Sequence, residues 1–359
     1  MPLREPFVSS AGERSERRIL LLRARGDEGH EGWGECVAGE VPSYSPEMTE
    51  TAWHVLTRFI LPGLLEREVL DPVEILRSSG WIRGHHMARA AAEMACWDLQ
   101  ARELGVPLGE LLGGDDDGVP VAVALGVHAD LGALSDRVQE ALDTGYAMVK
   151  LKVRPGHDVE PVRKLREQFP TLPLGVDANG AYALEDLPRL RELDEFGLVM
   201  LEQPFAPAAW LDHARLQGAL QTPICLDESI TGEAELQLAL ELEACRMVSL
   251  KPGLVGGLHV ARRMHDLCRD RGVPLRCGGM LESGIGRAHN LALASLPGFV
   301  VPGDLSESRR YWVQDLVTPE FGLVDGRMPA ARGPGIGVEP DLDRIEVLAV
   351  RRRGFGDLA

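Results

Sequence analysis

The chain has 359 residues, 45% of them hydrophobic and 26% charged, which is enough for one large domain and a smaller one. Its formal net charge of −17 disfavours nucleic acids and anionic membranes as partners. The six cysteines include no C-x-x-C pair, the N-terminus lacks an apolar signal-peptide core, and no long apolar run is present. These features predict a cytoplasmic protein with reduced thiols and no membrane span.

Residues 1–118 are predicted to form a small α+β domain. Residues 17–35 have the pattern of two strands around a polar, glycine-containing turn. A helix is expected to begin at Ser45, an N-cap residue that is followed by proline. A second, alanine-rich helix is expected to end at Gly105. The glycine and aspartate run at 113–118 indicates the end of this domain.

From residue 119 onward, short apolar segments alternate with segments of helical length. The expected strands are 119–126, 147–153, 173–177, 198–202, 223–227, 247–251, 274–278 and 299–303. Eight strands alternating with helices favour a parallel (β/α) barrel over a doubly wound open sheet, which seldom repeats so evenly. The segment after the eighth strand is a poor helix. The barrel is therefore expected to lack its last helix, and the chain end is expected to return to the first domain.

Five ionisable residues recur at the ends of the expected barrel strands with a nearly constant spacing. Lys152, Asp177, Glu202 and Asp227 follow one another at intervals of 25 residues, and Lys251 comes 24 residues later. Side chains alternate between the two faces of a strand, and the apolar neighbours must face the surrounding helices. All five are therefore expected to point into the barrel at the carboxyl ends of their strands, where barrel enzymes have their active sites.

The residue types in this set favour one kind of chemistry. Three converging carboxylates would repel one another without a cation, so Asp177, Glu202 and Asp227 are the predicted ligands of a metal ion. A set of oxygen ligands alone favours Mg²⁺ over Zn²⁺, and Mn²⁺ is expected to substitute. Lys152 and Lys251 are the predicted catalytic residues: a metal between two lysines suits a small carboxylate substrate, from which one lysine removes the adjacent proton to give an enediolate. Any one of the five, taken alone, is more often a solvated residue or a salt-bridge partner.

Other polar residues in the same segments have less specific patterns. Lys150 shares the inward face of its strand with Lys152. Asn179 and Glu228 either orient the metal ligands or only shape the turns in which they lie, and both alternatives stay open at this point.

In their order and spacing, these segments resemble the enolase superfamily and, within it, the muconate lactonizing subgroup. KLKV is similar to the K-x-K motif of the second barrel strand, DAN, EQP and DES to the three metal-ligand motifs, and KPG to the motif of the opposing lysine. Enolase-superfamily sites use a lysine or histidine base together with Mg²⁺. The resemblance implies an α/β fold in which a (β/α)7β TIM-like barrel, 119–318, lies under an α+β capping domain. Residues 1–118 and the C-terminal segment 319–359 would build that cap.

A closer similarity is to the branch of o-succinylbenzoate synthases and N-succinylamino acid racemases. Segments such as PICLDESI, SLKPGLVGG and CGGMLESGIGRAHNLALASLPGF carry it. The branch implies a flexible loop at residues 9–18 that closes over the substrate, and a homo-oligomer, either a dimer or an octamer. It also implies that the pocket is lined by Gly278, Gly279, Met280 and Glu282.

Two activities follow from this resemblance. The first is the dehydration of 2-succinyl-6-hydroxy-2,4-cyclohexadiene-1-carboxylate in menaquinone biosynthesis, with Lys152 as base and then acid, and Lys251 stabilising the enediolate from the other face. The alternative is racemisation of N-succinylamino acids, in which both lysines act as bases. A barrel that binds carboxylates without turnover is a third possibility, which the intact lysine pair disfavours.

Two further positions disfavour neighbouring branches of the superfamily. Dipeptide epimerases of the superfamily carry a D-x-D pair at the eighth strand, whereas here Asp304 is followed two residues later by Ser306. A histidine at position 251 would have indicated the mandelate racemase branch, and this chain has Lys251.

Overall fold

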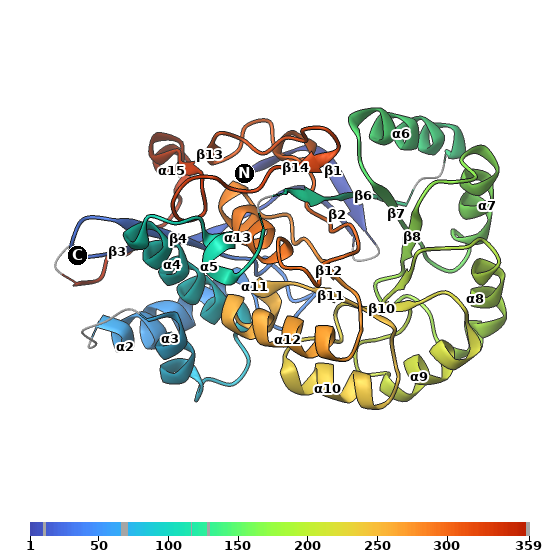
Figure 1. The fold of residues 1–359 in the computed structure, drawn as a ribbon, viewed down its shortest axis with the longest axis horizontal. Helices are drawn as coiled ribbons and strands as arrows, with labels where there is room; N and C mark the ends of the chain where they lie inside the picture. The colour runs from blue at the N-terminus through green and yellow to red at the C-terminus, as the bar shows by residue number, and fades with distance from the viewer. Residues whose placement is uncertain (10–11, 66–70, 116, 128–129, 357–359) are drawn as a thin grey trace.

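The computed structural model describes residues 1–9, 12–65, 71–115, 117–127 and 130–356. A curved parallel sheet forms its centre, and helices surround the outer face of that sheet (Figure 1). The seven strands are neighbours in chain order: β6 (Ala122–Leu125), β7 (Met148–Lys152), β8 (Leu174–Asp177), β9 (Leu201–Glu202), β10 (Ile224–Leu226), β11 (Met247–Leu250) and β12 (Leu275–Cys277).

A helix follows each of these strands, which is the connection that parallel strands require. In Figure 1 the first five lie in an arc outside the sheet. The helices are α6 (Leu131–Thr144), α7 (Val159–Gln168), α8 (Leu187–Asp194), α9 (Trp210–Ala219), α10 (Glu233–Glu241), the short α11 (Pro252–Val255) before α12 (Leu258–Asp270), and α13 (Gly284–Ala294). The (β/α)7β fold is confirmed in its seven βα units.

The expected eighth strand, 299–303, is wrong as a regular strand. This segment makes single contacts across the gap between the first and last strands: Val301 N donates to Leu275 O at 3.2 Å, and Ala122 N donates to Gly303 O at 2.7 Å. Pro302 has no N–H group to donate to a ladder. A bridge between Val121 and Gly303 therefore stands where the barrel would close.

The side chains of the sheet alternate as the sequence predicted. Outward-facing residues such as Val149, Leu151 and Val176 belong to the main core between the sheet and its helices. The inward-facing residues at the amino ends of the strands form a separate small cluster: Ala122, Met148, Met200, Cys225 and Met247. This apolar cluster lies beneath the ionisable residues, which occupy the carboxyl ends.

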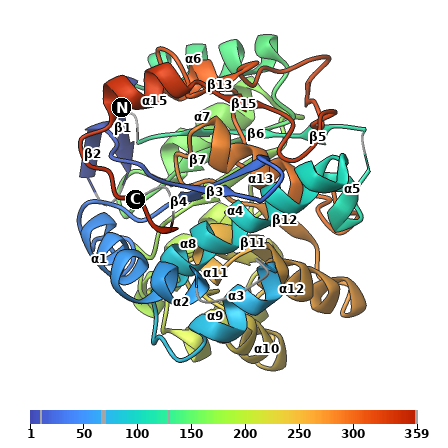
Figure 2. The same cartoon turned by 90° about the vertical axis from the view of Figure 1, so that its left-hand side faces the viewer.

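The cap contains a hairpin of β3 (Leu20–Arg25) and β4 (Glu31–Cys36). Its helical part comprises α1 (Thr49–Val55), a π-helical turn (Leu56–Ile60), α2 (Leu61–Leu65), α3 (Pro72–Ser79), α4 (His86–Leu104) and α5 (Leu108–Leu112). Figure 2 looks onto this side of the molecule, where α4 crosses it. Strand β4 needs glycine against α4, since a Cβ at Gly34 would lie 2.1 Å from Ala91 O.

One helix end in the cap is as expected and one is not. Helix α4 ends at Gly105, which has φ +70°, as the sequence predicted. The helix expected from Ser45 starts instead at Thr49. Thr49 N donates to Gly39 O at 2.8 Å, which closes the segment between them into a loop before the helix can begin.

Much of the N-terminal segment forms a hairpin, which corrects the expected loop at residues 9–18. Strand β1 (Pro2–Ser9) pairs antiparallel with β2 (Gly12–Glu16). Residues 10 and 11 lie outside the described part of the chain. The closing motion expected of this segment stays a prediction.

The C-terminal segment runs along both parts of the molecule. Strand β14 (Arg327–Met328) pairs with β5 (Val119–Pro120), while β13 (Val317–Thr318) pairs with β15 (Glu339–Pro340), which is followed by α15 (Leu342–Leu348). Ile336 N donates to Asp98 on α4 at 2.8 Å, so the segment contacts the cap. The domain boundaries at 118 and 318 stay a prediction.

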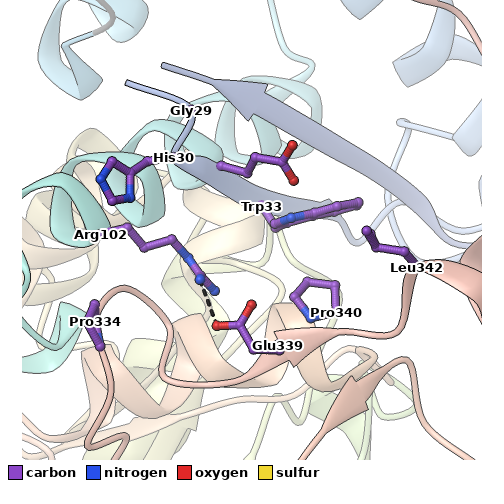
Figure 3. A pocket seen from close by; sticks show the side chains of 9 residues that line it. Gly29, His30, Trp33, Arg102, Pro334, Glu339, Pro340 and Leu342 are labelled. Carbon is purple, nitrogen blue, oxygen red and sulfur yellow. Dashed lines mark hydrogen bonds and ion pairs between the residues drawn. The ribbon is translucent and has the colours of Figure 1, made fainter. Parts of the chain in front are cut away.

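A cavity of about 400 Å³ lies where this segment meets the cap (Figure 3). Its charged side chains already have partners: Arg102 pairs with Glu339 at 2.8 Å, and Glu31 pairs with Arg23 and Arg25. The cavity is lined by cap and C-terminal residues and not by the carboxyl ends of barrel strands. It is therefore separate from the predicted site.

Two general predictions of composition can be compared with the fold. All six cysteines are free and buried, which agrees with reduced thiols. Among the described helices, none has the length and apolar character that crossing a membrane requires.

Candidate active site

The five ionisable residues of the 25-residue repeat lie at the carboxyl ends of five consecutive strands. Lys152, Asp177 and Glu202 end β7, β8 and β9 and are partners in the sheet register. Asp227 and Lys251 directly follow β10 and β11. Four are 5% exposed or less, and the side chain of Lys152 is 11% exposed. The nearly constant spacing in sequence thus places these side chains at the same end of the barrel.

The two lysines flank the three carboxylates. Lys152 Nζ lies 2.6 Å from Asp177 Oδ2, and Lys251 Nζ lies 2.7 Å from Asp227 Oδ2. The strand of Glu202 lies between the strands of the two aspartates. A substrate held at the carboxylates would therefore have an ammonium group on each side.

A second layer of charge lies beside Glu202. Arg276 Nη1 donates to Glu202 Oε2 at 2.8 Å, and its Nη2 donates to Asp304 Oδ1 at 2.7 Å. Lys150 pairs with Glu202 and Asp177, each at 3.0 Å, and also with Asp304. Arg276 is fully buried. Arg276 and Lys150 together hold the carboxylate of Glu202 in one orientation.

Sequence reasoning missed Arg276, although a usable signal was present. It lies 25 residues after Lys251, on the same period as the other five, and on the inward face of β12.

Asn179 and Glu228, for which two roles were left open, lie in the site. Lys152 Nζ donates to Asn179 Oδ1 at 2.6 Å, and Asn179 Nδ2 donates to Glu228 Oε1 at 2.8 Å. The second carboxylate oxygen of Glu228 is buried and has no hydrogen-bond partner among the described residues. An orphaned acceptor at this place is suited to a cation or to a ligand donor.

Tyr44 of the cap also reaches the site and was not predicted. Lys251 Nζ donates to its hydroxyl at 2.7 Å and lies 4.9 Å from the centre of its ring. The hydroxyl is 3.4 Å from both oxygens of Asp227. Tyr44 belongs to the loop between β4 and α1, where no periodic pattern marks a functional residue. Only the packing of the cap on the barrel brings it here.

The predicted pocket residues at 278–282 have different surroundings. Gly278 lies against Lys251, since a Cβ there would be 2.4 Å from the lysine Cε, and Gly279 lies equally close to Asp304 O. Met280 packs on the core of the cap. Glu282 is buried, with its oxygens accepting from Met280 N and from Asn290 Nδ2, both at 2.9 Å. In the described structure, the carboxylate of Glu282 stabilises the turn at 280–282 by these hydrogen bonds.

Burial and mutual repulsion govern the electrostatics of the site. Burial, together with the charge of Asp177, raises the pKa of Glu202 to about 8. Burial would likewise raise the pKa of Asp177, but Lys150 and Lys152 hold it well below its usual range. Burial and the charge of Asp227 raise the pKa of Glu228 to about 7. The lysines do not fully neutralise the carboxylates around them.

The donor set fits a hard divalent cation. Five carboxylates face four cationic side chains: Asp177, Glu202, Asp227, Glu228 and Asp304 against Lys150, Lys152, Lys251 and Arg276. With all five carboxylates ionised, a divalent ion would turn one excess negative charge into one excess positive charge, which suits an anionic substrate. The atoms of the carboxylates that could bind the ion are all oxygens, and one of them, Glu228 Oε2, has no hydrogen-bond partner among the described residues. Among the described residues no three His, Cys, Asp or Glu side chains are close enough to hold a metal in this arrangement, in which the lysines pair with the carboxylates.

The comparisons with known proteins agree with this geometry. Residues 1–113 match the N-terminal domain family of mandelate racemase and muconate lactonizing enzyme, and residues 133–344 match the enolase C-terminal domain-like family. The chain belongs to the enolase superfamily. Enolase-superfamily members use a divalent metal ion, as the carboxylate cluster suggested.

Within the enolase superfamily, two groups of relatives are similar over nearly the full length. An o-succinylbenzoate synthase from Geobacillus kaustophilus is 45% identical, with 96% of this chain and 92% of the relative covered. An N-succinylamino acid racemase from Amycolatopsis sp is 46% identical, with coverages of 99% and 96%. A solved enolase-superfamily structure from Listeria innocua has a TM-score of 0.93 at 39% identity, covering 96% of this chain and 93% of that one.

Proposed function

We propose that this enolase-superfamily protein is an o-succinylbenzoate synthase that dehydrates 2-succinyl-6-hydroxy-2,4-cyclohexadiene-1-carboxylate in menaquinone biosynthesis. The observation that carries the proposal is the pair of buried lysines on either side of three carboxylates. Relatives from Geobacillus kaustophilus and Bacillus subtilis, 45% and 43% identical, bear the name o-succinylbenzoate synthase and support this choice of substrate.

The proposed reaction uses Lys152 twice. Its neutral amine takes the proton from the carbon next to the substrate carboxylate, and the C–H electron pair moves into an enediolate. The resulting ammonium group then gives this proton to the hydroxyl group, which leaves as water: the electron pair of the enediolate forms a new C=C bond while the C–O bond breaks and its electrons leave with the water. Asn179 accepts a hydrogen bond from Lys152 Nζ and so orients it. Lys251 contributes positive charge from the other side of the site.

We propose that Asp177, Glu202 and Asp227 hold Mg²⁺, with Mn²⁺ as a substitute. When bound, the ion would stabilise the negative charge that develops on the substrate carboxylate. Chelation with EDTA should abolish activity, and Mg²⁺ or Mn²⁺ should restore it. Glu202→Gln, which removes one ligand charge, should weaken metal binding in a direct titration. Full activity of the metal-free enzyme would contradict all three assignments.

N-succinylamino acid racemase is the alternative function. The lysines on both sides of the site permit proton removal on one face and delivery on the other, and the Amycolatopsis relative has this name. Kinetic assays of the purified, metal-loaded protein with the cyclohexadiene substrate and with N-succinylamino acids separate the two functions. A kcat/KM for the amino acids well above that for the cyclohexadiene would favour the racemase. Binding of both without turnover would contradict both enzymes. A dimeric or octameric state stays a prediction that sedimentation can test.

A further inference from the structure

Gln203 has an unusual backbone conformation directly beside a proposed metal ligand. It follows Glu202, is fully buried, and has φ +38°, which is rare for a residue other than glycine. Such a conformation persists only where the surrounding structure enforces it. The contacts that enforce it are those of the Gln203 side chain and main chain.

The side-chain amide of Gln203 uses all of its hydrogen-bonding capacity. Its Oε1 accepts from Asp227 N at 3.0 Å and from Ser229 N at 3.2 Å. Its Nε2 donates to Phe205 O at 2.9 Å and to Ser229 Oγ at 2.8 Å. Only an amide side chain offers two donor hydrogens and one doubly accepting oxygen here, because a carboxylate has no hydrogens to donate.

The main chain of Gln203 extends these links to a third loop. Its C=O accepts from Gly180 N at 2.7 Å, and its N–H donates to Cys225 O at 2.9 Å. Gly180 lies in the loop after Asp177, and Asp227 begins the loop after β10. One buried residue thus connects the three consecutive loops that bear the three carboxylates.

We propose that Gln203 is a positioning residue that sets the spacing of Asp177, Glu202 and Asp227 for a divalent metal ion. The proposal rests on the proposed metal-binding function. Gln203 itself contacts neither metal nor substrate, because all its amide atoms face protein groups. It acts by holding Asp227 N and the backbone beside Glu202 at a fixed separation.

Gln217 provides a matched control, because its side chain contacts the amino end of β10, whereas Gln203 contacts the residues that follow the carboxyl end of β10. It is 2% exposed, and its amide accepts from Ile224 N at 2.7 Å and donates to Thr222 O at 3.3 Å. These contacts hold the amino end of β10, whereas Gln203 holds the carboxyl end. Replacement of either glutamine by methionine keeps the side-chain length and removes the hydrogen bonds.

The test is a direct titration of the metal-free full-length protein with Mg²⁺ and Mn²⁺ by calorimetry, for wild type, Gln203→Met and Gln217→Met. Thermal unfolding is measured in parallel, since both variants should lower Tm. Gln203→Met should weaken metal binding by about 10-fold or more, as for other residues that orient metal ligands. Gln217→Met should leave the Kd for metal within about twofold of wild type.

Different outcomes overturn different statements. A wild-type Kd in folded Gln203→Met, or equal losses in the two variants, would overturn the positioning role and leave the metal proposal intact. A wild-type protein that binds no divalent ion would overturn both. If Gln203→Met does not fold, Ser229→Ala replaces it in the titration, because this variant removes only the hydroxyl that accepts a hydrogen bond from Gln203 Nε2. This milder variant should still weaken metal binding several-fold, and an unchanged Kd would contradict the proposal.

Discussion

At the scale of single residues, Lys251 distinguishes the two candidate activities. Dehydration needs only one titrating lysine, whereas racemisation needs a proton donor or acceptor on each face. Lys251→Arg keeps a positive charge but gives up a usable base, because guanidinium stays protonated. We expect the variant to lose racemisation of N-succinylamino acids completely and to retain part of the dehydration. Both rates can be measured on the same preparation.

Exchange of the α-proton with deuterated water refines this experiment. In the Lys251→Arg variant, one enantiomer of an N-succinylamino acid should still exchange through Lys152, and the other should not exchange. Exchange of both enantiomers would show that another residue serves the second face. Loss of exchange for both, in a folded and metal-loaded variant, would show that Lys251 has a further role.

Tyr44 is expected to position Lys251 from the cap. Tyr44→Phe removes the hydroxyl that accepts from Lys251 Nζ at 2.7 Å. A hydrogen bond to a charged group contributes about 1.5–3 kcal/mol, so kcat/KM should fall by roughly 10-fold or more. Tyr182→Phe is the control, because that buried hydroxyl donates to Asp158 and does not reach the lysines. Equal kinetics of Tyr44→Phe and wild type would show that the hydroxyl is dispensable.

The residue scale also shows why part of the site was predictable. A repeat of 25 residues places side chains at equal heights in a βα barrel, so Lys152 and Lys251 could be located without coordinates. Tyr44 and Gln203 are different, because their roles arise from contacts between loops far apart in sequence. Such contacts leave no periodic trace in the sequence.

At the scale of elements, buried glutamates of the cap hold the amino ends of barrel helices. Glu93 on α4 accepts from Leu258 N and His259 N, at 2.9 and 2.8 Å, where α12 begins. Glu35 on β4 accepts from Ser283 N and Gly286 N, both at 3.1 Å for its Oε2, where α13 begins. These carboxylates supply acceptors for helix N–H groups that have no partner within the helix.

Stability should therefore depend on pH in a defined direction. Burial raises the pKa of Glu35 and of Glu93 from 4.5 to about 7, despite the hydrogen bonds that lower it. In the unfolded chain these groups lose their protons near 4.5, so the folded state binds more protons between about 4.5 and 7. Their contribution to the free energy of unfolding is then largest below about 4.5 and is lost as the pH rises through 7.

Urea unfolding at pH 5 and pH 8 tests this dependence. The Glu93→Gln variant cannot ionise, so its free energy of unfolding should fall less between the two pH values than that of wild type. Glu110→Gln, on the exposed side of α5, is the control and should show the wild-type difference. The same difference in Glu93→Gln would mean that Glu93 does not titrate in this range.

The elements differ in how far local sequence determines them. The barrel strands were predicted because short apolar runs alternate with segments of helical length, and the end of α4 was predicted because Gly105 is a typical helix C-cap. The segment 299–303 contains Pro302, which has no N–H group to donate to a neighbouring strand. In the hairpin of β1 and β2, the second strand is polar, and it forms only because it pairs with the first. Both outcomes are set by pairing and not by local composition.

At the scale of the whole molecule, part of the cap packs into the main hydrophobic core of the barrel, while a second cluster that includes Leu20, Leu56 and Ala88 belongs mostly to the cap. Trp33, Met94 and Leu108 of the cap belong to the same buried cluster as Val149 and Leu250 of the barrel. Within this cluster, the apolar side chains of the cap and those of the barrel form one continuous group. Unfolding one part would expose the apolar surface of the other, so the two should unfold together.

Metal binding at the barrel should therefore stabilise the cap as well. An ion that binds only the folded state, at 100 times its Kd, adds about 2.7 kcal/mol to the free energy of unfolding. Four of the six tryptophans, at 33, 53, 81 and 97, lie in the cap, so tryptophan fluorescence reports mainly on it. Saturating Mg²⁺ should raise the midpoint of thermal unfolding by the same amount in fluorescence and in far-ultraviolet circular dichroism, and EDTA should reverse both shifts. A fluorescence midpoint that stays fixed while the circular dichroism midpoint rises would show that the cap unfolds independently of the barrel, against the shared core.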